Sequence, residues 1–183
     1  MRIRFCVSLS FLILLAFYGC GGSAEVERKQ AQYAMDQAKS LHAADYAASN
    51  FEQAQTAWDR AQAAEKEGKT DKAKVLFTSA KIYFGKAGDV AKAKRDALSR
   101  ELDSMQLMIG SNLDQVKTDL TTKHLSAKQR SQVEAIVSGA EKANESISKL
   151  VSQDDLRKAV ATAKDVQTKI YHAQLILAGQ KIK

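Results

Sequence analysis

Residues 71–121, with the sequence DKAKVLFTSAKIYFGKAGDVAKAKRDALSRELDSMQLMIGSNLDQVKTDLT, decide the fold that we expect for this chain. Their apolar residues recur every three or four positions, which is the spacing of one face of an α-helix. From Ala73 to Leu120 the stripe covers 47 residues in 13 steps, with Lys94 filling one apolar slot, so the mean step is about 3.6 residues. A strict heptad repeat would give 3.5. The stretch therefore predicts one nearly straight helix, about 75 Å long at about 1.5 Å per residue.

Turn and capping signals divide the rest of the chain into further helices. The segment Glu65–Thr70 is the clearest turn, and its Gly68 suits the left-handed position that follows a helix. Ser49 and Ser126 each precede a Glu or Gln by three residues, as in a capping box. We expect helices that begin near Glu25, Ser49, Asp71, Ser126 and Leu156, the last of them ending at Gly179. The expected fold class is all-α: an elongated antiparallel helical bundle of about five helices, including one long central helix.

The composition supports this fold class and excludes other kinds of protein. The chain has no proline, and alanine, lysine, glutamine and leucine, which are good helix formers, abound. After residue 19 there are 26 basic residues (28 − 2) and 21 acidic ones, a net charge of +5. Because the two signs are interleaved, we expect no nucleic-acid partner. Both cysteines lie within the first 20 residues, so packing and not disulfides must stabilise the helical part of the chain.

The first 20 residues, MRIRFCVSLSFLILLAFYGC, have the pattern of a secretory signal. Arg2 and Arg4 form a basic start. The apolar run Phe5–Phe17 that comes next is about 13 residues long, which is too short to cross a hydrocarbon core of about 30 Å as a helix. These features predict export from the cytoplasm.

Small residues surround Cys20 at the end of this run, in Gly19-Cys20-Gly21-Gly22-Ser23. This ending resembles the lipobox of bacterial lipoproteins. The resemblance implies that Cys20 becomes the first residue of the mature chain and carries acyl chains such as palmitate, which would hold the protein on a membrane. By resemblance to the sorting of enterobacterial lipoproteins, Gly21 in place of Asp implies the periplasmic face of the outer membrane, and the outer leaflet of the inner membrane is the alternative. An ordinary secretory signal, cleaved near Gly22 or Ala24, is the alternative to lipidation.

These signals predict four parts: a lipoprotein signal peptide at 1–19, a lipidated tether at 20–24, an alanine-rich helical domain at 25–95, and a helical hairpin or bundle at 96–183 that continues the long helix. The chemistry differs between the two helical parts. All aromatic residues after the signal precede residue 85, except Tyr171. We therefore expect a core of aromatic residues and alanine in the first part and an aliphatic core in the second.

Residues 31–91 carry a second resemblance. They place alanine every three or four positions and contain the steps A-x-x-x-W-x-x-A, G-x-x-x-x-A and L-F-x-x-A. This pattern resembles the alanine-rich helical domain of unknown function in Gram-negative envelope lipoproteins, which in some relatives precedes an OmpA-like peptidoglycan-binding module. It is also similar to a tetratricopeptide helix pair. The second half lacks the mixed α/β pattern of an OmpA-like module, so the resemblance implies no wall binding of that kind.

No motif indicates catalysis. His42, His124 and His172 are scattered, and none has a second ligand at metal-binding spacing. Nucleophile and phosphate-loop motifs are absent from the sequence. The pair Asp154-Asp155 is either an acid pair or, more simply, a helix cap. We therefore expect no enzyme, no metal and no cofactor.

Three aromatic residues and the last residue are the candidates for binding. Trp58, Phe77 and Phe84 are most simply core, and the alternative is that they line a groove for a partner peptide. One repeat-like unit is short for such a groove unless the protein forms an oligomer. Lys183 invites comparison with the murein lipoprotein, whose terminal lysine is joined to peptidoglycan. The spacing Gly85-x-x-Gly88 favours a close helix crossing, or a kink or break in the long helix, over a ligand site.

The function expected from the sequence is therefore that of a non-enzymatic, membrane-anchored periplasmic lipoprotein. It would act as a structural or adaptor component of the cell envelope through helix-mediated protein interaction. The alternative is a peptidoglycan-associated lipoprotein that links the outer membrane to the cell wall through its basic faces or Lys183.

Overall fold

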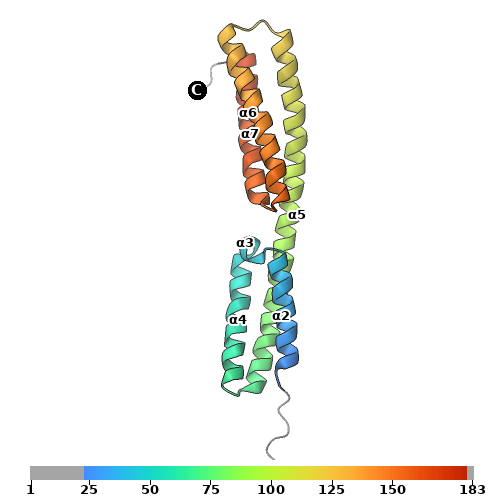
Figure 1. The fold of residues 1–183 in the computed structure, drawn as a ribbon, viewed down its shortest axis with the longest axis vertical. Coiled ribbons are helices and arrows are strands. Elements are labelled where there is room, and N and C mark those ends of the chain that lie inside the picture. Colours follow the sequence, from blue (N-terminus) through green and yellow to red (C-terminus); the bar gives the residue numbers. More distant parts are fainter. Residues whose placement is uncertain (1–22, 181–183) are drawn as a thin grey trace, which may run out of the picture. The chain divides into compact units, whose positions relative to one another are not determined.

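The structure is a computed structural model that describes residues 23–180. Within this range it contains six α-helices and no strand: α2 (Glu25–Ser40), α3 (Ala43–Tyr46), α4 (Ala48–Lys66), α5 (Thr70–Thr122), α6 (Ala127–Ser152) and α7 (Leu156–Leu177) (Figure 1). The predicted all-α class with one long central helix is confirmed.

Helix α5 continues without interruption for 53 residues. It passes through Gly85 and Gly88, so the break considered near Gly85 does not occur. The chain divides into two compact units, residues 1–92 (unit 1) and residues 93–183 (unit 2). The division falls inside α5, and each unit therefore contains one part of this helix.

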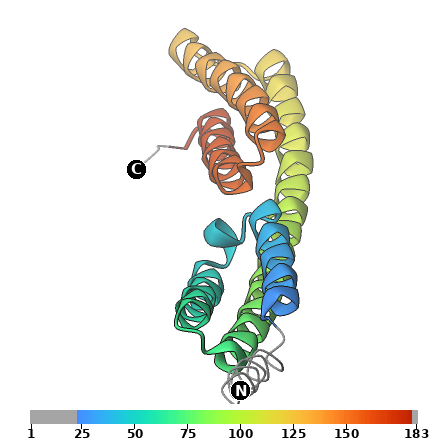
Figure 2. The same cartoon turned by 60° about the horizontal axis from the view of Figure 1, so that its bottom comes forward.

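Unit 1 is a three-helix bundle of α2, α4 and the first part of α5 (Figure 1, Figure 2). Helix α4 runs antiparallel to the other two. The core of unit 1 consists of a few large side chains surrounded by alanines, which allow the helix backbones to approach closely. The fully or almost fully buried residues include Ala31, Met35, Ala38, Ala54, Trp58, Ala61, Ala73, Phe77, Ala80, Phe84, Ala87 and Ala91. The predicted aromatic and alanine core is confirmed.

The turn between α4 and α5 follows the predicted chemistry. Gly68 has φ of 72°, a left-handed conformation that costs glycine little. The Lys69 N–H donates to the Ala64 carbonyl at 2.9 Å, which satisfies one of the last carbonyls of α4. The turn therefore ends α4 and lets the chain reverse into α5.

The start of α4 differs from the prediction. The capping box expected at Ser49 is wrong, because α4 begins at Ala48 and Ala47 occupies the cap position without a side-chain hydrogen bond. The segment before it forms the short helix α3, which follows His42 in a left-handed conformation with φ of 54°. The Ala47 N–H donates to the Ala43 carbonyl at 2.8 Å. This bond satisfies the N–H of the cap residue, which in a capping box the side chain of the third helical residue would do.

Unit 2 contains the second part of α5 together with α6 and α7. Its core is aliphatic, as predicted, and its fully buried large side chains include Ile109, Val116, Val133, Ile147 and Val166. The capping box at Ser126 is confirmed: the Gln129 N–H donates to Ser126 Oγ at 3.3 Å, and the Ser126 N–H donates to Gln129 Oε1 at 3.1 Å.

The two acids before α7 have different roles. Asp155 is the N-cap of α7, and its Oδ1 accepts from the Lys158 N–H at 3.2 Å. Asp154 has φ of 61° and pairs with Arg95 of α5. The capping interpretation of this pair is therefore confirmed for Asp155, while Asp154 joins the α6–α7 turn to α5.

Candidate partner-binding grooves

The three aromatic residues considered for partner binding lie in the core of unit 1. Phe77 and Phe84 are 0% exposed and Trp58 is 7% exposed. Trp58 packs edge to face on Phe77, with ring centroids 5.2 Å apart. Phe84 packs in the same way on Phe51 at 5.4 Å. Of the two alternatives that the sequence leaves open, the structure supports the core, and a groove for a partner must use other side chains.

An open groove lies between α4 and α5 in unit 1. Its volume is about 560 Å³. The lining residues are Ser49, Glu52, Gln53, Thr56, Ala57 and Arg60 of α4 and Leu76, Ser79 and Tyr83 of α5. Tyr83 is 37% exposed, and the Lys86 ammonium lies 5.9 Å from its ring centroid. The groove is open and mostly polar, with one aromatic face and charges of both signs, which suits an extended hydrophilic partner.

A smaller groove of about 270 Å³ lies between α2 and α5. Gly85 and Gly88 are among its lining residues. A Cβ added at Gly88 would lie 3.4 Å from Leu41 Cδ1, just after α2, whereas a Cβ on Gly85 would meet nothing within 4 Å. Gly88 therefore lies where α2 and α5 pack together, and a side chain as small as that of alanine would fit there in ordinary van der Waals contact. Tyr33 stands at the edge of this groove, and its hydroxyl accepts from Gln37 Nε2 at 2.8 Å.

Neither groove was predicted from the sequence, because a groove depends on how two helices pack together and the apolar period of one helix does not give that packing. Tyr33 and Tyr83 look like any other aromatic residue in the sequence. Their positions off the alanine stripes of α2 and α5 were the available signal. An aromatic side chain that leaves the apolar stripe of its own helix is a surface feature by periodicity alone.

Ion pairs between helices lie on the surface of each unit. Arg28 Nε of α2 is 3.9 Å from Glu65 Oε1 of α4. In unit 2, Lys117 of α5 pairs with Glu141 of α6 at 2.7 Å, and this hydrogen-bonded carboxylate raises the pKa of Lys117. Both partners of each pair are substantially exposed, and solvent screens such pairs, so they contribute little to stability. These pairs set how the helices align more than how stable they are.

The described residues show no assembled centre for metal or acid–base chemistry. His42 lies 3.7 Å from Asp45 on the α3 turn, and no group of three or more His, Cys, Asp or Glu among residues 23–180 is placed to hold a metal ion. No charged side chain in this range is fully buried, although single polar atoms such as Asn144 Oδ1 are. None of the helices in this range is both long and apolar enough to cross a membrane.

Two of the predicted site residues, Cys20 and Lys183, lie outside the described residues, as does the signal-like stretch. What the structure describes is the segment next to Cys20. Ala24, four residues further along, is 2% exposed, and its carbonyl accepts from the Arg28 N–H at 2.9 Å in the first turn of α2. Ala24, the first buried residue among those that the structure describes, therefore lies only four positions after the cysteine.

Together these features define the class of protein: an α-helical bundle protein of two units joined by one long helix, with open grooves beside α5 in unit 1. No protein-family model, curated protein or solved structure matches the chain.

Proposed function

We propose that this protein is a lipid-anchored, non-enzymatic adaptor of the bacterial cell envelope, attached through Cys20 to the periplasmic face of the outer membrane. The observation that carries the proposal is the spacing at its start. An apolar run too short to span a membrane ends at Cys20, and a helical unit begins four residues later at the buried Ala24. This arrangement suits a protein that is exported and then held close to a membrane surface.

The helical units supply the adaptor part of the proposal. No charged side chain within 23–180 is fully buried, so the charged groups of these units lie at least partly on the surface. The groove between α4 and α5 is the surface best shaped for a partner, because it combines Tyr83 with Glu52 and Arg60 along one open channel. Its mixed charges favour a protein segment with charges of both signs over a polyanion.

Acyl labelling of the full chain tests the anchor. The chain would be expressed in a Gram-negative host with an alkyne analogue of palmitate, beside a Cys20→Ser variant. We expect label in the wild-type protein, no label in the variant, and recovery of the wild type with the outer membrane. An unlabelled wild-type chain whose first residue lies near Gly22 or Ala24 would show an ordinary secretory signal and overturn the proposed anchor.

A photo-crosslinking amino acid at Tyr83 tests the adaptor role. Leu107 of unit 2, which is 78% exposed, offers a matched surface control. We expect discrete crosslinked proteins from position 83 and none of the same size from position 107. Equal crosslinking from the two positions would overturn a specific role for the groove.

Co-sedimentation of residues 21–183 with purified peptidoglycan tests the alternative. Pelleting that persists in high salt would favour a protein that links the membrane to the cell wall, and Lys183→Ala would be tested next. Pelleting that disappears in high salt would show only the attraction of a net charge of +5. Absence of pelleting would support the adaptor.

A further inference from the structure

We infer that one end of unit 1, formed by residues 24–29 and 65–72, is a membrane-facing surface that lies against lipid headgroups. We call it the membrane-facing end. The inference rests on the proposed lipidation of Cys20 and goes further, because it names the surface that meets the membrane and leaves the grooves beside α5 open to partners.

The reach of the tether places the start of α2 near the membrane. Ala24 lies four positions after Cys20, and a fully extended chain spans at most about 3.3–3.6 Å per position, so the two residues lie no more than about 14 Å apart. Ala24 is buried and hydrogen-bonded within unit 1. Acyl chains on Cys20 would therefore hold the first turn of α2 within about 14 Å of the membrane surface.

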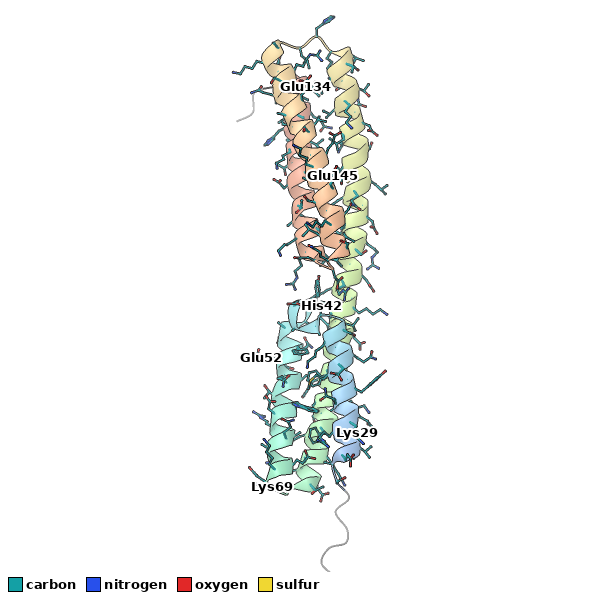
Figure 3. All side chains as sticks on the ribbon, in the orientation of Figure 1. Lys29, His42, Glu52, Lys69, Glu134 and Glu145 are labelled. Carbon is teal, nitrogen blue, oxygen red and sulfur yellow. The ribbon has the colours of Figure 1, made fainter. Side chains whose placement is uncertain are left out.

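The turn between α4 and α5 lies at the same end of unit 1. Arg28 of the first turn of α2 reaches Glu65 of the last turn of α4 at 3.9 Å, and the turn at Gly68 comes directly after it. Figure 3 shows Lys29 and Lys69 at this end of unit 1 and His42 at the opposite end. Helix α2 runs between these ends for 16 residues, which is about 24 Å.

The charges of the membrane-facing end are balanced. Its two segments contain five acidic and five basic residues. Lys29 pairs with Glu25 at 2.7 Å, and Lys69 pairs with Glu67 at 2.6 Å. Such a surface fits the polar headgroup layer but has little attraction of its own for anionic lipid. The tether, and not electrostatics, must therefore bring this end to the membrane.

Val26 gives this end an apolar contact. It lies in the first turn of α2, two residues after Ala24, and is 62% exposed. An exposed aliphatic side chain so close to the tether can enter the boundary between headgroups and acyl chains, where apolar side chains of surface-bound helices are buried.

Fluorescence quenching in vesicles tests the inference. Acylation would block the Cys20 thiol, and cleavage of the signal peptide would remove Cys6. A cysteine introduced elsewhere would therefore be the single reactive thiol of the mature chain. We would label Lys66→Cys at the membrane-facing end and Ser40→Cys at the last residue of α2, both exposed positions. Each full chain, purified in its acylated form, would be placed in phosphatidylcholine vesicles whose headgroups carry a nitroxide quencher.

We expect the label at position 66 to be quenched several-fold more strongly than the label at position 40, at low and at high salt alike. Insertion of ten Gly and Ser residues before Ser23 should weaken the quenching at position 66, because the longer tether lets unit 1 move away. Equal quenching at both positions would show that a long side of unit 1 lies along the membrane and would overturn the inference. Loss of quenching in high salt would also overturn it, since an electrostatic patch would then hold the protein.

The mass of each purified chain separates this outcome from failure of the proposed function. A mass without acyl chains would overturn the lipid anchor itself, and the inference with it. An acylated chain with equal quenching at both positions would leave the anchor standing and overturn only the membrane-facing end.

Discussion

Phe84→Ala should remove about half of the stability of unit 1 or more. Phe84 is 0% exposed and packs edge to face on Phe51 at 5.4 Å. Truncation of such a side chain costs about 3–5 kcal/mol, because apolar contacts are lost and a cavity remains. The described part of unit 1 has about 70 residues, for which about 0.05–0.15 kcal/mol per residue gives a total of about 4–10 kcal/mol.

Trp58 provides a fluorescence signal that reports on unit 1 alone, because it is the single tryptophan of the chain. Its ring packs on Phe77 and not on Phe84, so the substitution leaves the immediate contact of the probe in place. Urea unfolding of residues 21–183 would be followed by Trp58 emission and by circular dichroism, which reports helices of both units. With a slope of about 1.5 kcal/mol per molar urea, the emission midpoint should fall by about 2–3 M.

Ile147→Ala is the matched control in unit 2. Ile147 is also 0% exposed, and its truncation should cost about 2–5 kcal/mol. It should shift the transition seen by circular dichroism and leave the Trp58 midpoint nearly unchanged. If Ile147→Ala shifts the midpoint of the Trp58 emission as far as Phe84→Ala does, the two units unfold in one cooperative transition. The division within α5 would then not separate two independently stable units. A shift below about 0.5 M for Phe84→Ala would refute the packing described for unit 1.

Local geometry leads to four further expected outcomes. Gly85→Ala should raise the free energy of unfolding by about 0.5–1 kcal/mol, because the added Cβ meets nothing within 4 Å and alanine is the better helix former. Gly88→Leu should lower the free energy of unfolding, because a Cβ there already touches Leu41 at 3.4 Å and a leucine adds three more carbons. Thermal melts that rank the two variants the other way would contradict the packing of α2 on α5. Ser126→Ala should cost about 1 kcal/mol in urea unfolding through loss of the capping box, Ser126→Thr should cost less, and equal losses would argue against the cap. Asn144→Ala should stabilise unit 2 by about 1 kcal/mol, since Asn144 Oδ1 is buried without a partner and alanine is the better helix former. A loss of stability in this variant would show that Asn144 Oδ1 has a hydrogen-bond partner. A hydrogen bond from the Lys158 ammonium, and a second from the Lys158 backbone N–H, hold the pKa of Asp155 below its ordinary value of 3.8. The stabilising contribution of Asp155 is therefore present above that pH and is lost as the pH falls through the folded pKa. Asp155→Asn should make the loss of stability in acid less steep, and an unchanged dependence of stability on acid pH would contradict the cap.

The elements that the sequence predicted well are those governed by local rules. The apolar period of α5 and the turn at Gly68 depend on residues within a few positions of each other, and both agree with the structure. The capping box at Ser126 is local in the same sense, and its two hydrogen bonds lie where the spacing placed them. Local propensity and tertiary packing agree at these points, so the sequence alone is enough.

The start of α4 shows where local rules fail. Ser49 and Glu52 satisfy the spacing of a capping box, yet the cap is Ala47 and α4 begins at Ala48, two residues earlier than such a box would place them. Ala43 and Tyr46 are buried, so residues 43–46 pack in the core as α3, and the chain enters α4 directly from α3 through Ala47. A burial that depends on neighbouring helices cannot be recognised in a window of four residues.

Lys94 shows how a single polar residue in an apolar stripe marks a boundary. By period it occupies a core position between Ala91 and Leu98, and a continuous bundle would have to bury it. The structure leaves Lys94 exposed, and no residue of α5 between Ala91 and Leu102 is fully buried. The period of α5 is thus continuous while its burial is not, because a lysine tolerates solvent and cannot be buried without a partner.

Lys94→Leu would complete the stripe, and an exposed leucine there should change the stability of either unit by less than about 0.5 kcal/mol, as expected of a surface position. A gain of about 1 kcal/mol or more in urea unfolding would mean that this position is buried in solution and that the two cores are one.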